Sequence, residues 1–253
     1  MKAIILAAGV GSRIPSVSKY KPKCFVEING KTILQQLMDV FHAVGIKDIS
    51  IVIGYKRGMI QQKFRGENIK WYVNPLYRST GMLESLYCAK KEFDDDCLIV
   101  YGDVYIKEKV AKRLAGCSGD FCIAIDQKVI PTKREDAFET YSGKTFRKGK
   151  TMVKLKKEEI TQIGKNIITA DGIYIGLLKV SRQKAKEIMA EMDILKKKDT
   201  FRMFPSPSYL LQLLLEKGER MNAVKVSHKD YAEIDYVADL IQARKKFTTQ
   251  NPQ

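Results

Sequence analysis

The chain has 253 residues, 45% of them hydrophobic, and a formal net charge of +16 at pH 7. Its length and apolar content predict a single domain over residues 1–253. No apolar run is long enough to span a membrane, and the first apolar run is too short and too early for a signal peptide. The lysines are scattered without a recognition motif or an aromatic strip, so the charge favours attraction of anionic substrates, and nucleic-acid binding is kept as the non-enzymatic alternative.

The first predicted strand, 2–8, ends in a glycine-rich turn. Backbone N–H groups in such a turn approach a phosphate closely, and its small side chains leave room for a base or a ribose. Arg13 and Lys23 supply the positive charge that a triphosphate needs, so both are predicted to be catalytic. We predict that the nucleotide contacts the turn residues Leu6, Ala7, Ala8, Gly9, Gly11 and Ser12.

Two other phosphate-binding loops do not fit the sequence. The dinucleotide fingerprint needs a third glycine where Ile14 stands, and Pro15 argues against a long helix directly after the turn. A Walker-type loop ending at Lys144-Thr145 would need a glycine where Phe138 stands. We therefore interpret residues 143–145 as a hairpin turn.

Predicted strands and helices alternate through the first half of the chain, with strands at 2–8, 48–54, 69–74 and 97–102 and helices at 32–44, 56–65 and 81–92. Thr32 is the expected cap of the first helix, and Asn29-Gly30 forms a tight turn before it. Such alternation predicts a parallel sheet with helices on both faces. The polar residues that follow the strands should then gather at the carboxyl edge of that sheet.

The second half is richer in predicted strands, at 121–126, 151–155 and 167–180, followed by helices at 181–197, 206–217 and 235–247. We expect these strands to extend the sheet and to form a lid over an acceptor. The single domain thus divides into a nucleotide-binding half, 1–120, and an acceptor-binding half, 121–235. The tail 248–253 is expected to be disordered.

The cysteines show no CxxC pairing and lie mostly in apolar runs. All five are therefore predicted to be reduced core residues of a cytoplasmic protein. With only two histidines in the chain, a zinc site has little support. The five are Cys24, Cys88, Cys97, Cys117 and Cys122.

The segment 6–13, read as L-A-A-G-x-G-S-R, together with Lys21-Pro22-Lys23 resembles the signature of the nucleotidyltransferases that activate phosphorylated sugars and alcohols. The likeness continues in order through Ile53-Gly54-Tyr55, Asn74-Pro75, Tyr101-Gly102-Asp103 and Glu233-Ile234-Asp235. Within that family the chain is most similar to small cytidylyltransferases acting on phosphocholine, aminoethylphosphonate, inositol phosphate or phosphoglutamine. The resemblance implies a Rossmann-like, three-layer α/β/α fold with a mixed, mainly parallel sheet and a β-rich acceptor lid.

The resemblance also implies a reaction in which CTP and a phosphorylated small molecule give a CDP-linked product and pyrophosphate. Asp103 and Asp235 resemble the residues that hold Mg2+, although Asp103 could be a turn aspartate and Asp235 a helix N-cap. Asn74, Thr80 and Gly81 are candidates for contact with the base edge, and Thr80 could instead cap the helix at 81–92.

On the acceptor side, Lys165 and Tyr174 are the predicted contacts. The cations between residues 133 and 148 crowd a region where phosphocholine enzymes use an aromatic and acidic cage, so a phosphorylated amino acid or a phosphonate is favoured over choline. A sugar-1-phosphate nucleotidyltransferase using UTP or dTTP is the enzymatic alternative. Glycosyl transfer is disfavoured because Asp103-Val104-Tyr105 lacks the second aspartate of a D-x-D motif. A homodimer is one arrangement that the sequence leaves open.

Overall fold

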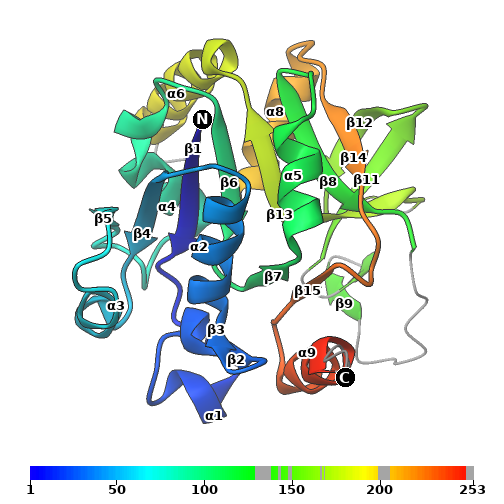
Figure 1. Ribbon diagram of the computed structural model, residues 1–253. Coiled ribbons are helices and arrows are strands. Elements are labelled where there is room, and N and C mark those ends of the chain that lie inside the picture. The colour runs from blue at the N-terminus through cyan, green and yellow to red at the C-terminus, as the bar shows by residue number, and fades with distance from the viewer. Residues whose placement is uncertain are drawn as a thin grey trace.

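The computed structural model describes residues 1–128, 138–141, 144–147, 150–165, 167, 169–198 and 206–248. Within these residues a mixed nine-stranded sheet runs through the molecule with helices on both faces (Figure 1). This is the three-layer architecture expected from the sequence. In spatial order, the strands are β11 (Thr151–Lys156), β12 (Glu159–Gly164), β14 (Asn222–Lys225), β8 (Phe121–Asp126), β13 (Gly172–Val180), β6 (Cys97–Tyr101), β1 (Lys2–Ala7), β4 (Asp48–Ile53) and β5 (Ile69–Val73).

The first half of the chain forms the parallel part of this sheet. Strand β1 lies between β4 and β6 and is parallel to both, and β5 continues the sheet beyond β4. The chain continues from β1 to β4 and β5 on one side and then returns to β6 on the other side of β1. The carboxyl end of β1 therefore lies at a topological switch point, where open α/β sheets bind ligands. The glycine-rich turn follows β1 at this point.

The second half adds antiparallel strands, as the prediction of a mixed sheet required. Strand β13 pairs antiparallel with β6 and β8, and β11 pairs antiparallel with β12 and with one end of β13. The register of β13 against β8 shifts between Tyr174 and Leu178. On one side of this shift β13 also pairs with β11, and on the other side it pairs with β6. The observed β13 begins at Gly172, five residues after the predicted start of this strand.

Two groups of helices cover the sheet (Figure 1). Helices α2 and α5 pack against each other on one face, whereas α4, α6 and α8 are joined by contacts on the other, such as the hydrogen bond from Tyr87 to Asp193. The Thr32 side chain accepts a hydrogen bond from Gln35 N, which confirms the predicted cap of α2. The helices are α1 (Pro15–Ser18), α2 (Ile33–Ala43), α3 (Arg57–Lys63), α4 (Met82–Cys88), α5 (Glu108–Ala115), α6 (Arg182–Lys197), α8 (Pro207–Glu216) and α9 (Val237–Thr248), with 3-10 turns at Lys23–Phe25 and Lys90–Glu92.

Short two-stranded sheets flank the main one. The pair β2 (Glu27–Ile28) and β3 (Lys31–Thr32) is joined by the predicted Asn29-Gly30 turn. Strand β9 (Phe138–Tyr141) pairs antiparallel with β10 (Lys144–Arg147), so Lys144 and Thr145 lie in a strand and not in the turn predicted at 143–145. The pair β7 (Val104–Ile106) and β15 (Tyr231–Glu233) escaped the sequence analysis because its strands are only three residues long. It joins a segment near the middle of the chain to one near its C-terminus.

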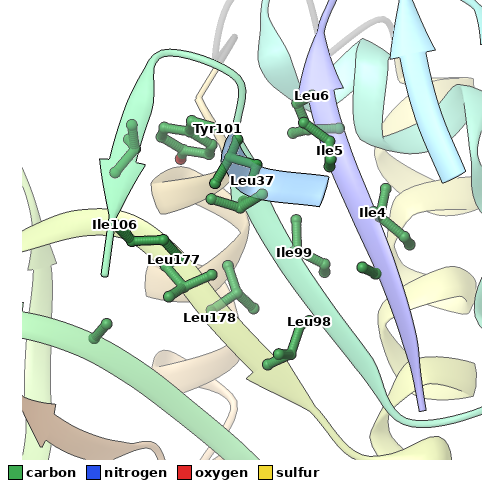
Figure 2. Close-up of a cluster of buried hydrophobic side chains, with 14 of the residues drawn as sticks. Ile4, Ile5, Leu6, Leu37, Leu98, Ile99, Tyr101, Ile106, Leu177 and Leu178 are labelled. Carbon is green, nitrogen blue, oxygen red and sulfur yellow. The ribbon is translucent and has the colours of Figure 1, made fainter. Parts of the chain in front are cut away.

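The apolar core lies between the sheet and its two helix layers. Side chains from the adjacent strands β1, β6 and β13 meet there, among them Ile4, Ile99 and Leu178 (Figure 2). Tyr101, the last residue of β6, packs among these side chains and carries the core up to the carboxyl edge of the sheet (Figure 2). Within the described residues, none of the helices has the length and apolar content that crossing a bilayer requires.

The prediction that all five cysteines are reduced is wrong for two of them. Cys117 and Cys122 form a disulfide across the turn between α5 and β8. The chain reverses within five residues there, which brings the two Cα atoms to 6.4 Å, a distance that a disulfide can span. Cys24 and Cys97 are buried free thiols, and Cys88 is a partly buried one. The tail 249–253 lies outside the described residues.

Candidate active site

A cavity of about 250 Å³ opens at the carboxyl edge of the sheet, where its parallel and antiparallel parts meet. Both halves of the chain contribute to its wall, as the sequence analysis expected of a site shared by a nucleotide and an acceptor. The described residues that line it are Arg13, Gly81, Met82, Tyr101, Asp103, Thr151, Lys165, Tyr174, Gly176, Ser206, Glu233 and Asp235.

Lys23 bridges the two aspartates predicted to bind metal. Its Nζ atom donates to Asp103 Oδ2 at 2.6 Å and to Asp235 Oδ1 at 3.1 Å. Arg13 Nη2 donates to the same Asp235 oxygen at 2.6 Å. The structure therefore brings together four residues predicted from sequence, two basic and two acidic.

Burial and charge act in opposite directions on these groups. Burial alone would raise the pKa of Asp235, but Lys23, Lys150 and Arg13 outweigh it and lower that pKa. Burial alone would lower the pKa of Lys23, but Asp103 and Asp235 outweigh it and raise that pKa. The lysine therefore stays protonated and the Asp235 carboxylate ionised around neutral pH, which is the pair of states that phosphate and metal binding need.

Backbone pairing explains how residues so far apart in sequence meet. Asp103 follows β6, and Gly102 N donates to Leu6 O at 2.9 Å, which fixes this turn against the end of β1. Strand β7 then pairs with β15, and Ile234 N donates to Asp103 O at 3.0 Å. Asp235, one residue further on, is thereby placed beside Asp103.

The alternative role of Asp235 as a helix cap is not what the structure shows. Helix α9 begins at Val237, and the N–H groups of Asp235 and Tyr236 donate to Asp239 Oδ2 at 2.8 and 2.7 Å. Asp239 thus performs the capping, and the Asp235 carboxylate faces Arg13 and Lys23. The guanidinium of Arg13 also lies 5.3 Å from the centre of the Tyr236 ring, in cation–π contact.

Two further charged residues belong to the cluster. Lys150 forms an ion pair with Glu233, and its Nζ atom lies 3.8 Å from Asp235 Oδ2. Burial and the neighbouring carboxylates raise the pKa of Glu233, while Lys150 opposes the rise. Glu233 stood inside a motif noted in the sequence but was given no role. Nothing in the sequence around Lys150 pointed to this position, because its partners come from strand β15.

The glycine-rich turn is built around Lys23. Gly11 has a φ of +70°, and a Cβ added there would lie 2.8 Å from the Cβ of Lys23. Ala7 and Ala8 are buried, and Ala8 O accepts a hydrogen bond from Tyr55 N at 3.0 Å. Gly9 and Ser12 are exposed, so their backbone is open to a ligand. The loop thus packs on one side against the lysine and on the other against the sheet.

Two of the three candidates for base contact form hydrogen bonds with neighbouring residues. Asn74 is only 1% exposed; its Nδ2 donates to Ser85 Oγ at 3.0 Å, and its Oδ1 accepts from Leu76 N at 2.9 Å. Thr80 donates to Leu76 O at 2.8 Å and does not cap α4, whose N-cap position is held by Gly81. Asn74 and Thr80 thus shape the loop 74–81, whereas Gly81 itself lines the cavity.

Lys165 and Tyr174, the residues predicted to contact the acceptor, both line the cavity. The cations noted between 133 and 148 lie where the structure does not describe side chains. Among the described residues, no group of three or more His, Cys, Asp or Glu side chains could hold a metal by itself. The Asp103–Asp235 pair could hold one together with ligand oxygens.

The profile of the MobA-like NTP transferase domain matches residues 3–152 of this chain. The chain belongs to the MobA-like NTP transferase family. It is a nucleotidyltransferase, as the resemblance noted in the sequence implied, and membership favours the enzymatic interpretation over nucleic-acid binding.

Two curated relatives of this MobA-like NTP transferase are named for phosphorylated or phosphonate compounds. The chain is 30% identical to the CTP:phosphoglutamine cytidylyltransferase of Campylobacter jejuni, in an alignment that covers 95% of this chain and 98% of the relative. It is 29% identical to the CMP-5'-(3-aminopropyl)phosphonate synthase of Streptomyces rubellomurinus, over 52% of this chain and 22% of that protein. The first match therefore extends over both halves of the domain.

Solved structures confirm the fold of the MobA-like NTP transferase over its whole length. The CTP:phosphocholine cytidylyltransferase of Streptococcus pneumoniae superposes with a TM-score of 0.77 over 96% of this chain and 97% of that one. The inositol-1-phosphate CTP transferase of T. maritima gives a TM-score of 0.74 over 100% and 98%. Both are 19% identical to this chain, so they establish the shared fold alone.

Proposed function

We propose that the chain is a Mg2+-dependent cytidylyltransferase, which joins CTP to a phosphorylated small molecule and releases pyrophosphate. The observation that carries this proposal is the bridge from Lys23 to Asp103 and Asp235, with Arg13 on the same aspartate. Cations for a triphosphate and carboxylates for a metal thus meet at one end of the glycine-rich turn. The match to CTP:phosphoglutamine cytidylyltransferase, which extends over nearly the whole of both chains, supports CTP as the nucleotide.

In this reaction an oxygen of the acceptor phosphate attacks the α-phosphorus of CTP in line, and pyrophosphate leaves. Two anions must approach each other, so the protein's main tasks are to hold them in line and to offset their charge. Arg13 and Lys23 bind the triphosphate and offset the negative charge that develops on pyrophosphate. Leu6, Ala7, Ala8, Gly9, Gly11 and Ser12 supply the backbone that surrounds the nucleotide.

The residues present fit a bound Mg2+. Asp103 Oδ1 is buried and has no hydrogen-bond partner in the described part of the chain, so this carboxylate has an oxygen left for a cation. Asp103 and Asp235 would hold the metal, whose remaining ligands would be phosphate oxygens and water. When bound, it supplies positive charge at the phosphates. Arg13 and Lys23, which contact these aspartates in the free protein, would contact the triphosphate.

For the acceptor, Lys165 and Tyr174 are the proposed contacts, and a phosphorylated amino acid is the favoured class. Lys165 gives the cavity wall a cation. The relative with the near-complete match is named for phosphoglutamine, which supports the same class of acceptor. The protein is expected to act in the cytoplasm.

Pyrophosphate release measured with CTP, UTP, GTP, ATP and dTTP in turn, with Mg2+ and a mixed pool of phosphorylated acceptors, tests the proposal. Release with CTP alone is the expected result. A preference for UTP or dTTP would instead indicate a sugar-1-phosphate nucleotidyltransferase. Binding of none of the five nucleotides would contradict the proposed function altogether.

A further inference from the structure

Two buried tyrosine hydroxyls in the cavity wall have no hydrogen-bond partner among the residues that the structure describes. Tyr101 is 7% exposed and Tyr174 is 3% exposed, and both line the cavity. The hydroxyls lie near each other and near Ser206, yet neither is in hydrogen-bonding geometry with any described atom. A buried hydroxyl without a partner destabilises a fold, so its presence at a cavity calls for an explanation.

The fold fixes the positions of these two rings. Tyr101 ends β6 and Tyr174 lies in the neighbouring β13, with ring centroids 5.8 Å apart and planes at 80°, an edge-to-face pair. Gly176 has a φ of +79°, and a Cβ added there would lie 2.7 Å from Tyr101 Cδ2. The register of β13 shifts at the same place. The two rings therefore cannot turn away to find other partners without disturbing the strand.

The chemistry of a phenol limits what could satisfy the pair. A buried phenol hydroxyl donates to a strong acceptor, such as a carboxylate or carbonyl oxygen. A quaternary ammonium neither donates nor accepts a hydrogen bond, so it would leave both hydroxyls unpaired. Three acidic side chains line the same cavity, and each is paired: Glu233 with Lys150, and Asp103 and Asp235 with Lys23. Lys165 adds a positive charge to this wall, so the local charge does not oppose a carboxylate.

We propose that the hydroxyls of Tyr101 and Tyr174 donate hydrogen bonds to a carboxylate of the acceptor, and that they select phosphorylated amino acids over alkylammonium alcohol phosphates. The inference rests on the proposed function, since it concerns the acceptor of that reaction. It gives Tyr101 a role in specificity that its position before Gly102-Asp103 did not suggest.

Acceptors that differ only in the carboxylate test this directly. Phosphoserine and phosphoglutamine are each compared with the decarboxylated counterpart, phosphoethanolamine and N-phosphoryl-4-aminobutanamide, with phosphocholine as a fifth acceptor. The wild-type enzyme should prefer the carboxylate-bearing member of a pair. In Tyr101→Phe and Tyr174→Phe, the KM for that member should rise about 10-fold, as loss of one charge-assisted hydrogen bond predicts, while the KM for CTP and for the decarboxylated member stays unchanged.

A stability measurement separates this role from a structural one. Each Tyr→Phe change removes a hydroxyl that is unsatisfied without substrate, so the Tm of the free protein should stay the same or rise. Tyr231→Phe is the matched control: its hydroxyl donates to the buried Asp126 Oδ2 at 2.9 Å, so this variant should have a lower Tm. A lowered Tm for both cavity variants would identify their hydroxyls as structural and overturn the inference.

The acceptor preference and the binding of CTP also test the inference. Equal or better use of phosphocholine or of the decarboxylated acceptors would overturn the inference and leave the cytidylyltransferase proposal standing. An enzyme that binds CTP but uses neither amino-acid phosphate would do the same. Failure to bind CTP would instead overturn the proposed function.

Discussion

The Nζ atom of Lys23 lies 2.6 Å from Oδ2 of Asp103, a residue 80 positions further along the chain. Both side chains are mostly buried, so each satisfies a charge that would otherwise be costly in this location. In the free protein Lys23 is therefore paired with Asp103. A ligand that binds to either side chain has to replace this ion pair. Substitutions at either residue should affect the reaction more than the fold.

Asp103→Asn should reduce turnover to background, because an amide binds Mg2+ far more weakly than a carboxylate does. The side chain keeps its shape, so the protein should remain folded, with an unchanged far-UV circular dichroism spectrum. Asp235→Asn should behave in the same way. Near-normal rates in both variants would show that these residues do not hold the metal.

Lys23→Ala should lower kcat by about 10²- to 10³-fold and change the KM for CTP much less. The reason is that the lysine is proposed to stabilise charge that develops on pyrophosphate only in the transition state. Steady-state kinetics with CTP as the varied substrate would measure the split. A large rise in KM at constant kcat would instead make Lys23 a ground-state binding residue.

Gly11→Ala should impair the enzyme through Lys23. The new Cβ would lie 2.8 Å from the Cβ of Lys23, and the residue would have to keep a φ of +70°, at a cost of about 1–2 kcal/mol. Thermal unfolding should show the loss of stability. Gly9→Ala is the matched control, since a Cβ there meets nothing within 4 Å, and its Tm should stay close to that of the wild type.

Lys150→Met should lower the free energy of unfolding by about 1–3 kcal/mol, because Glu233 and Asp235 would lose a shared cation in a partly buried place. Urea denaturation would measure the change. Lys154→Met, at an exposed position in β11, serves as the control and should alter stability by less than about 0.5 kcal/mol. Equal effects of the two substitutions would mean that the Lys150 ion pairs contribute nothing.

The stability of the protein should fall on acidification partly through Glu92. Burial alone would raise the pKa of this carboxyl, but hydrogen bonds from Tyr72, Lys2 and Lys70 outweigh it and hold the pKa below the ordinary 4.5. A lowered pKa contributes stability above the unfolded value, and this contribution is lost as pH falls through the folded value. Denaturation curves between about pH 3 and pH 7 should therefore show a shallower loss for Glu92→Gln than for the wild type.

The parallel half of the fold could be predicted because its signals are local. The apolar run of β1, the cap at Thr32 and the alternation of strand and helix each depend on neighbours in sequence. Arg13, Lys23, Asp103 and Asp235 follow from motifs at the ends of elements, and the structure brings them together.

The rest depends on contacts between distant segments. Lys150, for example, finds its ion-pair partner Glu233 at the end of β15. The Cys117–Cys122 disulfide is local in sequence, but it depends on the sharp turn before β8, which the sequence analysis did not predict. Asn74 shows a different limit: the sequence reveals an amide near the site but not that the loop around it satisfies both ends of that amide. These hydrogen bonds depend on how the loop packs, and the spacing of residues in the sequence does not predict them.

The pairing of β7 with β15 has a consequence for the biogenesis of the enzyme. Asp103 receives its partner Asp235 only after β15 has paired with β7, so the metal pair is absent from every nascent chain in which residue 235 is still inside the ribosome. The glycine-rich turn, by contrast, precedes both of these strands in the chain. The cluster of cations and carboxylates at the cavity is therefore completed only when β15 has joined β7.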